Sequence, residues 1–215
     1  MRLLRDNYFI ESDADLAYKL KGTTLDLWTD PDYNKGFTHN AVVSGIVRIL
    51  PISIQPRKKV RHANGHDHIE GFYNHTPLQE GDKVYVHHNV VDKRHERRME
   101  DGTKLYLCPH FQVIAVVREG VVIPLQDWVL STPVMEPEEN FKKMIGGKEI
   151  YLKPERERMK NQLQAKFLSL PALEEGLSKG DVFHHHNDAD YEIIIEGETL
   201  YRTSIKHING IVNKL

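Results

Sequence analysis

Short apolar runs separated by turn residues dominate the chain, and this pattern favours strands over helices. The clearest run is residues 41–50, which is rich in Val and Ile and is stopped by Pro51. Comparable runs occupy residues 105–107, 113–117, 121–123, 128–130, 193–195 and 208–212. Strands at such spacing, with Gly-containing turns between them, are typical of a small β-barrel or sandwich. The sequence therefore predicts an all-β fold.

Two stretches interrupt this pattern. Residues 52–79 have no clear periodicity but contain Asn64-Gly65, which is a strong hairpin-turn signal. We expect a β-hairpin here that leaves the body of the fold. Residues 155–168 are ambiguous, because Met159, Leu163 and Phe167 lie four residues apart and would line one face of a helix.

A repeated phrase divides the chain. Gly81-Asp82 and Gly180-Asp181 each open an apolar strand that leads into His-His-Asn. Four further pairs recur in the same order: Gly22, Leu25 and Leu27 with Gly147, Ile150 and Leu152; residues 49–51 with 169–171; Glu119-Gly120 with Glu196-Gly197; and residues 127–130 with 206–209. Matched strands with unequal loops are expected of a diverged duplication, because surface loops change length at small free-energy cost. The repeat predicts two domains, residues 1–131 and 132–215. Because residues 49–51 end a strand at Pro51, the matching residues 169–171 predict a strand that ends at Pro171.

The order of these elements resembles the chaperonin-10 family, the GroES-like co-chaperonins. Residues 179–183, 191–198 and 204–212 carry the similarity in the second copy, and residues 6–10, 22–27, 43–50 and 81–86 carry it in the first. In that family each domain is a small irregular β-barrel, and edge strands join the subunits into a ring. The resemblance implies two tandem GroES-like barrels, with a roof-like hairpin at residues 52–79 and a short or absent roof in the second. The enlarged, duplicated body suggests a divergent, phage-encoded form.

The resemblance also implies a function. Members of the family dock on a chaperonin through a mobile loop that carries an aliphatic triplet, and they cap its folding chamber. The matching positions are Leu25, Asp26 and Leu27 in the first copy and Ile150, Tyr151 and Leu152 in the second. A segment with two large aliphatics can bury them in a partner's groove with moderate affinity. The implied partners are a GroEL-like chaperonin ring, which itself binds ATP, and further copies of this chain in a homo-oligomeric ring.

Two other interpretations stay open. The chain could be a structural ring or virion component that keeps the barrel without docking on a chaperonin, and the six positions would then be ordinary strand residues. It could also be a metal-dependent enzyme, because its 13 histidines include two clusters that could ligate zinc or nickel: His184, His185 and His186 with Asp188 and Asp190, and His62, His66 and His68.

We do not expect the chain to catalyse a reaction or to bind a metal. Successive strand residues point to opposite faces, so only His184 and His186 share one, and no HExxH motif is present. Cys108 is followed by Pro109-His110, and neighbouring strand positions disfavour a Cys-His pair. We therefore expect polar strand ends, an inert core cysteine, and no catalytic residue, metal or cofactor.

Composition limits the binding partners and the cellular compartment that we expect for the protein. The 215 residues are 40% hydrophobic and 28% charged, with a formal net charge of -2, which argues against bulk electrostatic capture of nucleic acid. The single cysteine excludes an internal disulfide and fits a reducing compartment. The first residues lack the apolar core of a signal peptide, and no run approaches the length of a membrane helix. We expect a cytoplasmic protein that does not enter a membrane.

Overall fold

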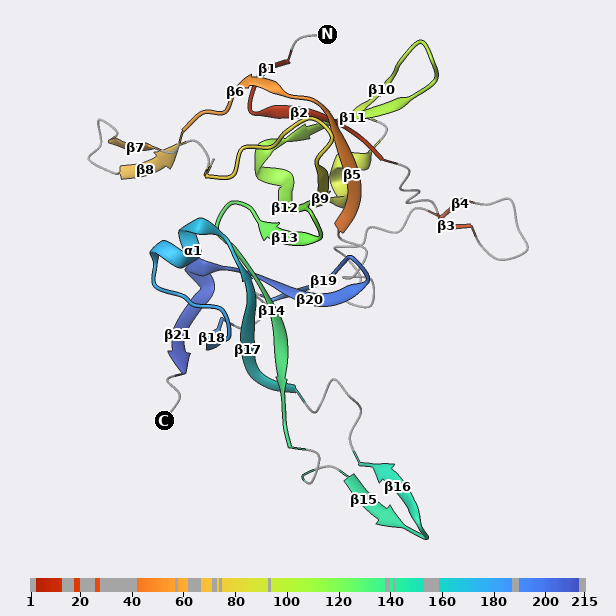
Figure 1. Cartoon of the computed structure of the whole chain (residues 1–215), viewed down its shortest axis with the longest axis vertical. Coiled ribbons are helices and arrows are strands. Elements are labelled where there is room, and N and C mark those ends of the chain that lie inside the picture. Colours follow the sequence, from red (N-terminus) through yellow and green to blue (C-terminus); the bar gives the residue numbers. More distant parts are fainter. Residues whose placement is uncertain are drawn as a thin grey trace.

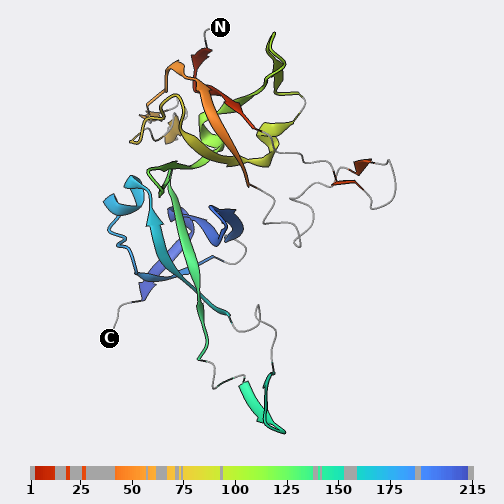
Figure 2. The same ribbon diagram turned by 45° about the vertical axis from the view of Figure 1, so that its right-hand side comes forward.

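A computed structural model gives the fold, and it describes residues 3–12, 18–19, 26–27, 42–56, 58–61, 67–70, 73, 75–92, 94–137, 140, 142–152, 159–186 and 190–212. Within these residues the chain is mostly β-strand with one short α-helix, so the predicted all-β class is confirmed. Figures 1 and 2 show two lobes stacked along the long axis. We call the elements up to β13 the first lobe and those from β14 onward the second lobe.

The first lobe is built on a seven-stranded antiparallel sheet of order β10-β11-β2-β5-β9-β12-β13. Its strands are β2 (Asn7–Glu11), β5 (Val42–Ile49), β9 (Lys83–His87), β10 (Glu96–Arg98), β11 (Lys104–Pro109), β12 (Val113–Arg118) and β13 (Val121–Pro124). Two 3-10 turns, η2 (His88–Val91) and η3 (His110–Gln112), follow β9 and β11.

Three small strand pairs accompany this sheet. They are β1 (Leu3–Arg5) with β6 (Pro51–Ser53), β3 (Tyr18–Lys19) with β4 (Asp26–Leu27), and β7 (Lys58–Arg61) with β8 (Asp67–Glu70). The β7–β8 hairpin lies within residues 52–79, where the sequence predicts a hairpin.

The second lobe is built on a six-stranded sheet of order β19-β20-β14-β17-β18-β21. Its strands are β14 (Trp128–Met135), β17 (Met159–Leu168), β18 (Val182–His185), β19 (Tyr191–Ile195), β20 (Glu198–Ser204) and β21 (Ile208–Val212). A separate hairpin, β15 (Lys142–Ile145) with β16 (Lys148–Tyr151), stands between β14 and β17 along the chain. Helix α1 (Leu170–Glu174) follows β17, and the 3-10 turn η6 (Ile205–His207) follows β20.

The ambiguous stretch is resolved in favour of a strand. Residues 159–168 form β17, and pairing with β14 on one side and β18 on the other outweighs the helical spacing of Met159, Leu163 and Phe167. The expected strand end at Pro171 is wrong. β17 ends at Leu168 because Pro171 stands in the first turn of α1, where a proline fits without losing a hydrogen bond.

The two sheets repeat one arrangement. Six strands match in order: β10, β11, β2, β5, β9 and β12 of the first sheet with β19, β20, β14, β17, β18 and β21 of the second. The registers also match, since Asn7 opposite Pro109 corresponds to Trp128 opposite Ser204. Two bulges recur at matching positions, one in β2–β5 and β14–β17, the other in β9–β12 and β18–β21. Bulges are specific features of a strand pair, so their agreement supports an internal duplication.

The two Gly-Asp turns are built alike. Gly81 and Gly180 have φ values of 90° and 93°, which favour glycine. In each turn the glycine N–H donates to a strand carbonyl and the aspartate accepts from a backbone N–H. The distances are 2.8 Å for Gly81 N to Val47 O and for Gly180 N to Ala165 O, 2.7 Å for Gln79 N to Asp82 Oδ2, and 2.8 Å for Ser178 N to Asp181 Oδ2. The repeated phrase therefore marks one structural device used twice.

Asp82 is also held by Arg118, whose Nε and Nη2 lie 3.0 Å and 2.6 Å from the two carboxylate oxygens. Burial alone would raise the pKa of Asp82, but the hydrogen bonds from Arg118 and the Gln79 N–H outweigh burial and lower it. A carboxylate with a lowered pKa stabilises the fold above its unfolded pKa of about 3.9. That contribution is lost as the pH falls through the folded-state value.

Replacing Asp82 should show how much its ion pair with Arg118 contributes to stability. We expect Asp82→Asn to lower the free energy of unfolding at pH 7 by about 1–3 kcal/mol. The difference from wild type should shrink as the pH falls from about 4 through the lower folded-state pKa of Asp82, because the wild-type carboxylate is protonated over that interval. Asp181→Asn is the matched control, because an asparagine oxygen still accepts the turn N–H in both variants. Urea unfolding across pH measures both, and equal losses at the two positions would contradict the assignment to Arg118.

Pairing of the strands corrects the predicted boundary between domains. β14 pairs with β17 and β20, so a boundary after residue 131 cuts through a strand of the second sheet. The change of sheet lies between Pro124 and Trp128. Two of the repeat anchors also change partners. Glu196-Gly197 joins β19 to β20, whose counterpart is the β10–β11 hairpin and not Glu119-Gly120, and β21 corresponds to β12 and not to residues 127–130.

Three apolar clusters form the core. One lies within the first lobe, around Tyr8, Ile10 and Val84, and one within the second lobe, around Leu163 and Phe183. The third joins the lobes: Val42, Tyr85, Ile114, Ala115 and Val122 pack with Leu130, Ile193, Ile195 and Leu200. The lobes therefore share buried apolar surface, which is the largest stabilising contribution available to them.

A polar contact closes the rim of this shared cluster. The Tyr85 hydroxyl donates to Glu196 Oε1 at 2.9 Å and accepts from the Glu196 N–H at 3.0 Å. Lys83 Nζ lies 2.5 Å from the same carboxylate oxygen. Hydrogen bonds from Lys83 and Tyr85 lower the pKa of Glu196. The β19–β20 turn is thus fixed on the first lobe.

Candidate partner-binding hairpin

The β15–β16 hairpin projects from the second lobe, away from both sheets (Figures 1 and 2). Its two-residue turn is Gly146-Gly147, with φ values of 60° and 76°. Positive φ at both central positions is what a tight hairpin turn of this kind requires, and glycine adopts it without steric cost. Lys142 lies opposite Tyr151 and Ile145 opposite Lys148, so the register is fixed along the whole hairpin.

The strand register sorts the side chains onto two faces. Cross-strand partners share a face and successive residues alternate, so Ile145 and Ile150 lie on one face with Lys143 and Lys148. Leu152 directly follows β16 and is also exposed, so we group it with these two aliphatics. We call Ile145, Ile150 and Leu152 the aliphatic face. It combines three large aliphatics with two lysines.

The opposite face holds Lys142, Met144, Glu149 and Tyr151. Lys142 Nζ lies 2.7 Å from Glu149 Oε2 and 5.5 Å from the centre of the Tyr151 ring. These contacts occupy the polar groups of this face within the hairpin itself. The aliphatic face is therefore the better candidate for a partner's apolar groove.

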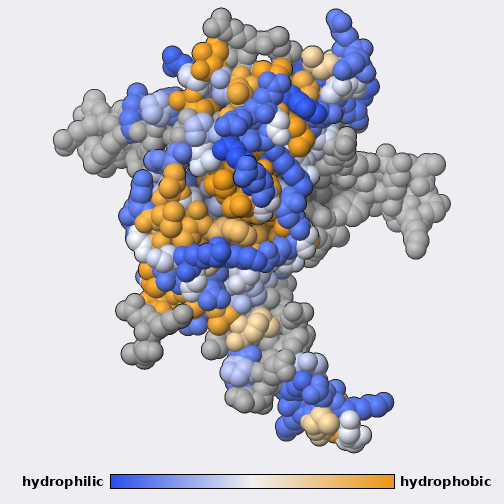
Figure 3. All heavy atoms as spheres, viewed as in Figure 1, coloured by the Kyte–Doolittle hydropathy of each residue, from blue (hydrophilic) through white to orange (hydrophobic). Residues whose placement is uncertain are grey.

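Exposure of apolar side chains distinguishes this hairpin. Met144, Ile145, Ile150, Tyr151 and Leu152 are between 41% and 66% exposed. Figure 3 shows the hairpin apart from the body, with hydrophilic residues in blue beside paler and orange residues. Clustered apolar exposure rimmed by charges is typical of a protein-binding surface. Of the positions predicted from the sequence, Ile150, Tyr151 and Leu152 all lie here, exposed.

The structure describes only two of the three predicted positions of the first copy. Leu25 lies outside the described residues, and Asp26 and Leu27 form β4, which pairs with β3. The β3–β4 hairpin stands between β2 and β5, where β15–β16 stands between β14 and β17. The structure thus places Ile150, Tyr151 and Leu152 at one hairpin and Asp26 and Leu27 in another, and it does not bring the two hairpins together (Figure 1).

Met144 and Ile145 are apolar contact candidates that the sequence analysis missed. They precede Gly146-Gly147, and the resemblance considered only the residues after this pair. A double glycine between two short runs that each contain Ile was the available signal for a hairpin that places Ile145 beside Ile150.

The histidine clusters do not form a metal centre in the part of the chain that the structure describes. No group of three or more His, Cys, Asp or Glu side chains comes together there. His184 and His186 are exposed and His185 is buried, as strand alternation predicts. His185 Nδ1 lies 2.9 Å from His186 O and 3.8 Å from Asp190 Oδ1. Asp188, His62 and His66 lie outside the described residues.

Cys108 and His110 do not face each other as a catalytic pair. Cys108 is fully buried, and burial raises the pKa of its thiol, so the reactive thiolate does not form at neutral pH. His110 instead bonds with Tyr8: Nδ1 lies 3.0 Å from the Tyr8 hydroxyl and Nε2 lies 2.8 Å from Tyr73 O. Since a carbonyl only accepts, Nε2 carries the proton and Nδ1 accepts from Tyr8.

Burial lowers the pKa of His110 to about 4 from an ordinary value of 6.5. The unfolded chain therefore binds a proton in the interval between these values that the folded chain does not. We expect the contribution of neutral His110 to be fully present above pH 6.5 and to fall by about 1.4 kcal/mol per pH unit toward pH 4. His110→Gln should flatten this part of the curve of unfolding free energy against pH. Parallel curves for the two proteins would refute the assignment.

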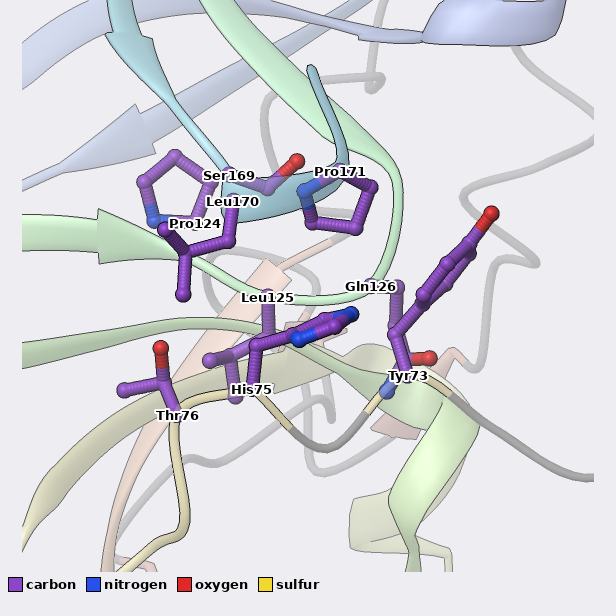
Figure 4. A pocket seen from close by; sticks show the side chains of 9 residues that line it. All are labelled: Tyr73, His75, Thr76, Pro124, Leu125, Gln126, Ser169, Leu170 and Pro171. Carbon is purple, nitrogen blue, oxygen red and sulfur yellow. The ribbon is translucent and has the colours of Figure 1, made fainter. Parts of the chain in front are cut away.

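A small hollow lies at the seam of the lobes (Figure 4). Its volume is about 10 Å³, room for a single water molecule. It is lined by Tyr73, His75 and Thr76, by Pro124, Leu125 and Gln126, and by Ser169, Leu170 and Pro171. Three chain segments thus meet here, and the site is too small for an organic substrate.

Comparison with known proteins found no relative of this chain. The chain matches no known protein family and no curated protein. In the described residues, no helix has the length and apolar character needed to cross a membrane. The candidate site is therefore supported by its geometry and by the sequence pattern.

Proposed function

We propose that this protein is a GroES-like co-chaperonin: it docks on a chaperonin ring through its projecting hairpins and caps the folding chamber. The observation that carries the proposal is the β15–β16 hairpin, which holds its apolar residues away from the core (Figure 2). Its position in the chain, between the first and second strands of the repeat, is where the resemblance expects the docking loop. The β3–β4 hairpin occupies the same position in the first repeat.

The chemistry of the aliphatic face fits such a partner. Burying Ile145, Ile150 and Leu152 in an apolar groove contributes roughly 1.5–3 kcal/mol for each side chain before the cost of association. Lys143 and Lys148 flank them and favour a groove rimmed by acidic side chains. The binding energy of one hairpin is modest, so several copies acting together in a ring give strong capture with ready release. ATP is bound by the partner, and this chain supplies no catalytic group.

A structural ring or virion component is the second candidate. It uses the same repeated lobes and the same self-assembly but leaves the hairpins without a chaperonin. The hairpin exposure favours docking, because a protein without a partner for this surface carries an aggregation hazard.

Capture on a chaperonin tests the proposal. Purified protein is mixed with a GroEL-like ring with and without ATP, and bound protein is measured after separation by size. We expect nucleotide-dependent binding that also protects the β15–β16 hairpin from proteolysis. Absence of binding with every chaperonin of the host cell, at concentrations where this protein self-assembles, would favour the structural candidate.

A further inference from the structure

Helix α1 turns its larger apolar side chains away from the core. Pro171 and Ala172 are buried, and Ala172 packs in the core of the second lobe. Leu170 and Leu173, by contrast, are 43% and 47% exposed. They lie three residues apart and share the outer side of the helix with Glu174. A helix that only covers the core carries polar residues on this side, so the two leucines are available to another surface.

The surroundings of these leucines are acidic. Glu174 and Glu175 are both exposed at the end of α1, and neither carboxylate forms an ion pair within the described part of the chain. Lys179 precedes Gly180, whose N–H donates to Ala165 O, so this lysine lies beside the interior of β17. Figure 3 shows apolar residues, in orange, gathered around α1 at the seam of the lobes. We define the α1 surface by four exposed residues: Leu170, Leu173, Glu174 and Glu175.

The aliphatic face of the β15–β16 hairpin is complementary to the α1 surface. Lys143 and Lys148 lie on the same face as its isoleucines, and both lysines are exposed. Neither lysine forms an ion pair among the residues that the structure describes, whereas Lys142 on the other face pairs with Glu149. Aliphatics flanked by unpaired cations thus match leucines flanked by unpaired carboxylates, in both apolar character and charge.

The two surfaces of one chain do not meet. α1 lies at the seam of the lobes, whereas the hairpin stands at the far end of the long axis, beyond β14 and β17 (Figures 1 and 2). A contact between them therefore takes two chains. We infer that the aliphatic face of one copy binds the α1 surface of a second copy, with Lys143 and Lys148 against Glu174 and Glu175.

This self-contact covers the side chains that the proposed function assigns to chaperonin docking. A chain whose hairpin is covered by a second copy cannot dock, so its apparent affinity for a chaperonin falls with the covered fraction. Self-association and docking compete for one surface, which makes docking dependent on the concentration of this protein. The self-contact rests on the two surfaces alone, and only this regulatory consequence rests on the proposed function.

Disulfide trapping between copies tests the self-contact. One copy carries Leu173→Cys and the other Ile150→Cys, and the two are mixed at micromolar concentration under mild oxidation. Native Cys108 is buried and does not compete. We expect a linked species of two 24.9 kDa chains, and mass spectrometry of the linked peptides separates this mixed pair from like pairs. Ile194→Cys, exposed on β19, replaces Leu173→Cys as the control and should be trapped about tenfold less or lower, because no contact raises its effective concentration.

Charge reversal separates a specific contact from chance collision. Lys143→Glu/Lys148→Glu in the Ile150→Cys copy places like charges together and should lower trapping by about tenfold or more. Adding Glu174→Lys/Glu175→Lys to the other copy should restore trapping, because opposite charges then face each other again. All four positions are exposed, so the substitutions leave the core intact. Absence of trapping, or trapping that charge reversal does not change, would overturn the self-contact.

Chaperonin capture distinguishes this inference from the proposed function. Glu174→Lys/Glu175→Lys leaves the hairpin unchanged. At a concentration where half of the wild-type hairpins are covered, this variant should be captured about twofold more tightly than wild type. Equal capture of the two proteins would overturn the competition. If neither protein is captured by a chaperonin while trapping persists, the proposed function fails and the self-contact holds.

Discussion

The double variant Ile150→Asp/Leu152→Asp should lose capture by a chaperonin by a factor of 100 or more. Each substitution removes an aliphatic side chain worth roughly 1.5–3 kcal/mol on burial and places a carboxylate in an apolar groove. Both positions are exposed, so the free energy of unfolding should change by no more than about 0.5 kcal/mol. Binding is measured by nucleotide-dependent pull-down and by competition with wild type.

Glu149→Gln is the matched control for this variant. It lies on the opposite face of the same hairpin and breaks only the contact with Lys142. We expect its capture to stay within about threefold of wild type, since an exposed ion pair contributes at most about 1 kcal/mol. Equal loss in Glu149→Gln would assign the effect to hairpin folding, and full capture by the double variant would remove the aliphatic face from the docking surface.

Leu130→Ala should destabilise the protein by about 2–5 kcal/mol. Leu130 is fully buried in the cluster that joins the lobes, where it packs with Tyr85 and Ile114 of the first lobe and Leu200 of the second. Its truncation leaves a cavity that neither rigid sheet can easily fill. The loss should affect both lobes together, because this core belongs to both.

Urea unfolding followed by circular dichroism and by tryptophan fluorescence measures this effect, in a Trp28→Phe background that leaves Trp128 as the only tryptophan. Trp128 packs against the shared cluster, so its emission reports on the seam. Ile194→Ala is the control, since Ile194 lies between buried neighbours on β19 but is 40% exposed itself, and its loss should stay below about 1 kcal/mol. A small effect of Leu130→Ala, or unfolding of one lobe well before the other, would show that the lobes are independent.

Much of the fold could be predicted because its signals are local. Apolar alternation gave the strands, and the Gly-Asp turn works through the φ of Gly81 and Gly180 and the carboxylates of Asp82 and Asp181, all of which are encoded within a few residues. The excursion at residues 52–79 carried its own turn signal. Predictions that depended on partners failed more often. Glu119-Gly120 and Glu196-Gly197 look alike, yet they join strands of different roles.

The candidate site also has a part that the sequence predicted and a part that only the structure shows. Ile150, Tyr151 and Leu152 were found through the resemblance, but which of them share a face depends on the register across Gly146-Gly147. Only that register adds Ile145 to Ile150 and separates Tyr151 from both. Exposure of these side chains also cannot be read from their type, because isoleucine and leucine are usually core residues.

The sequence by itself determined the all-β class and the existence of a repeat, since periodicity and turn chemistry are properties of short segments. The tertiary structure decided where one repeat ends and the next begins. Residues 121–126, with Leu125, lead directly into the first strand of the second sheet, yet they fill the core of the first lobe. Burial of apolar surface and completion of a strand ladder depend on what lies nearby in space. No local pattern around residues 121–126 records that neighbour, so only the folded chain could show the contact that joins the lobes.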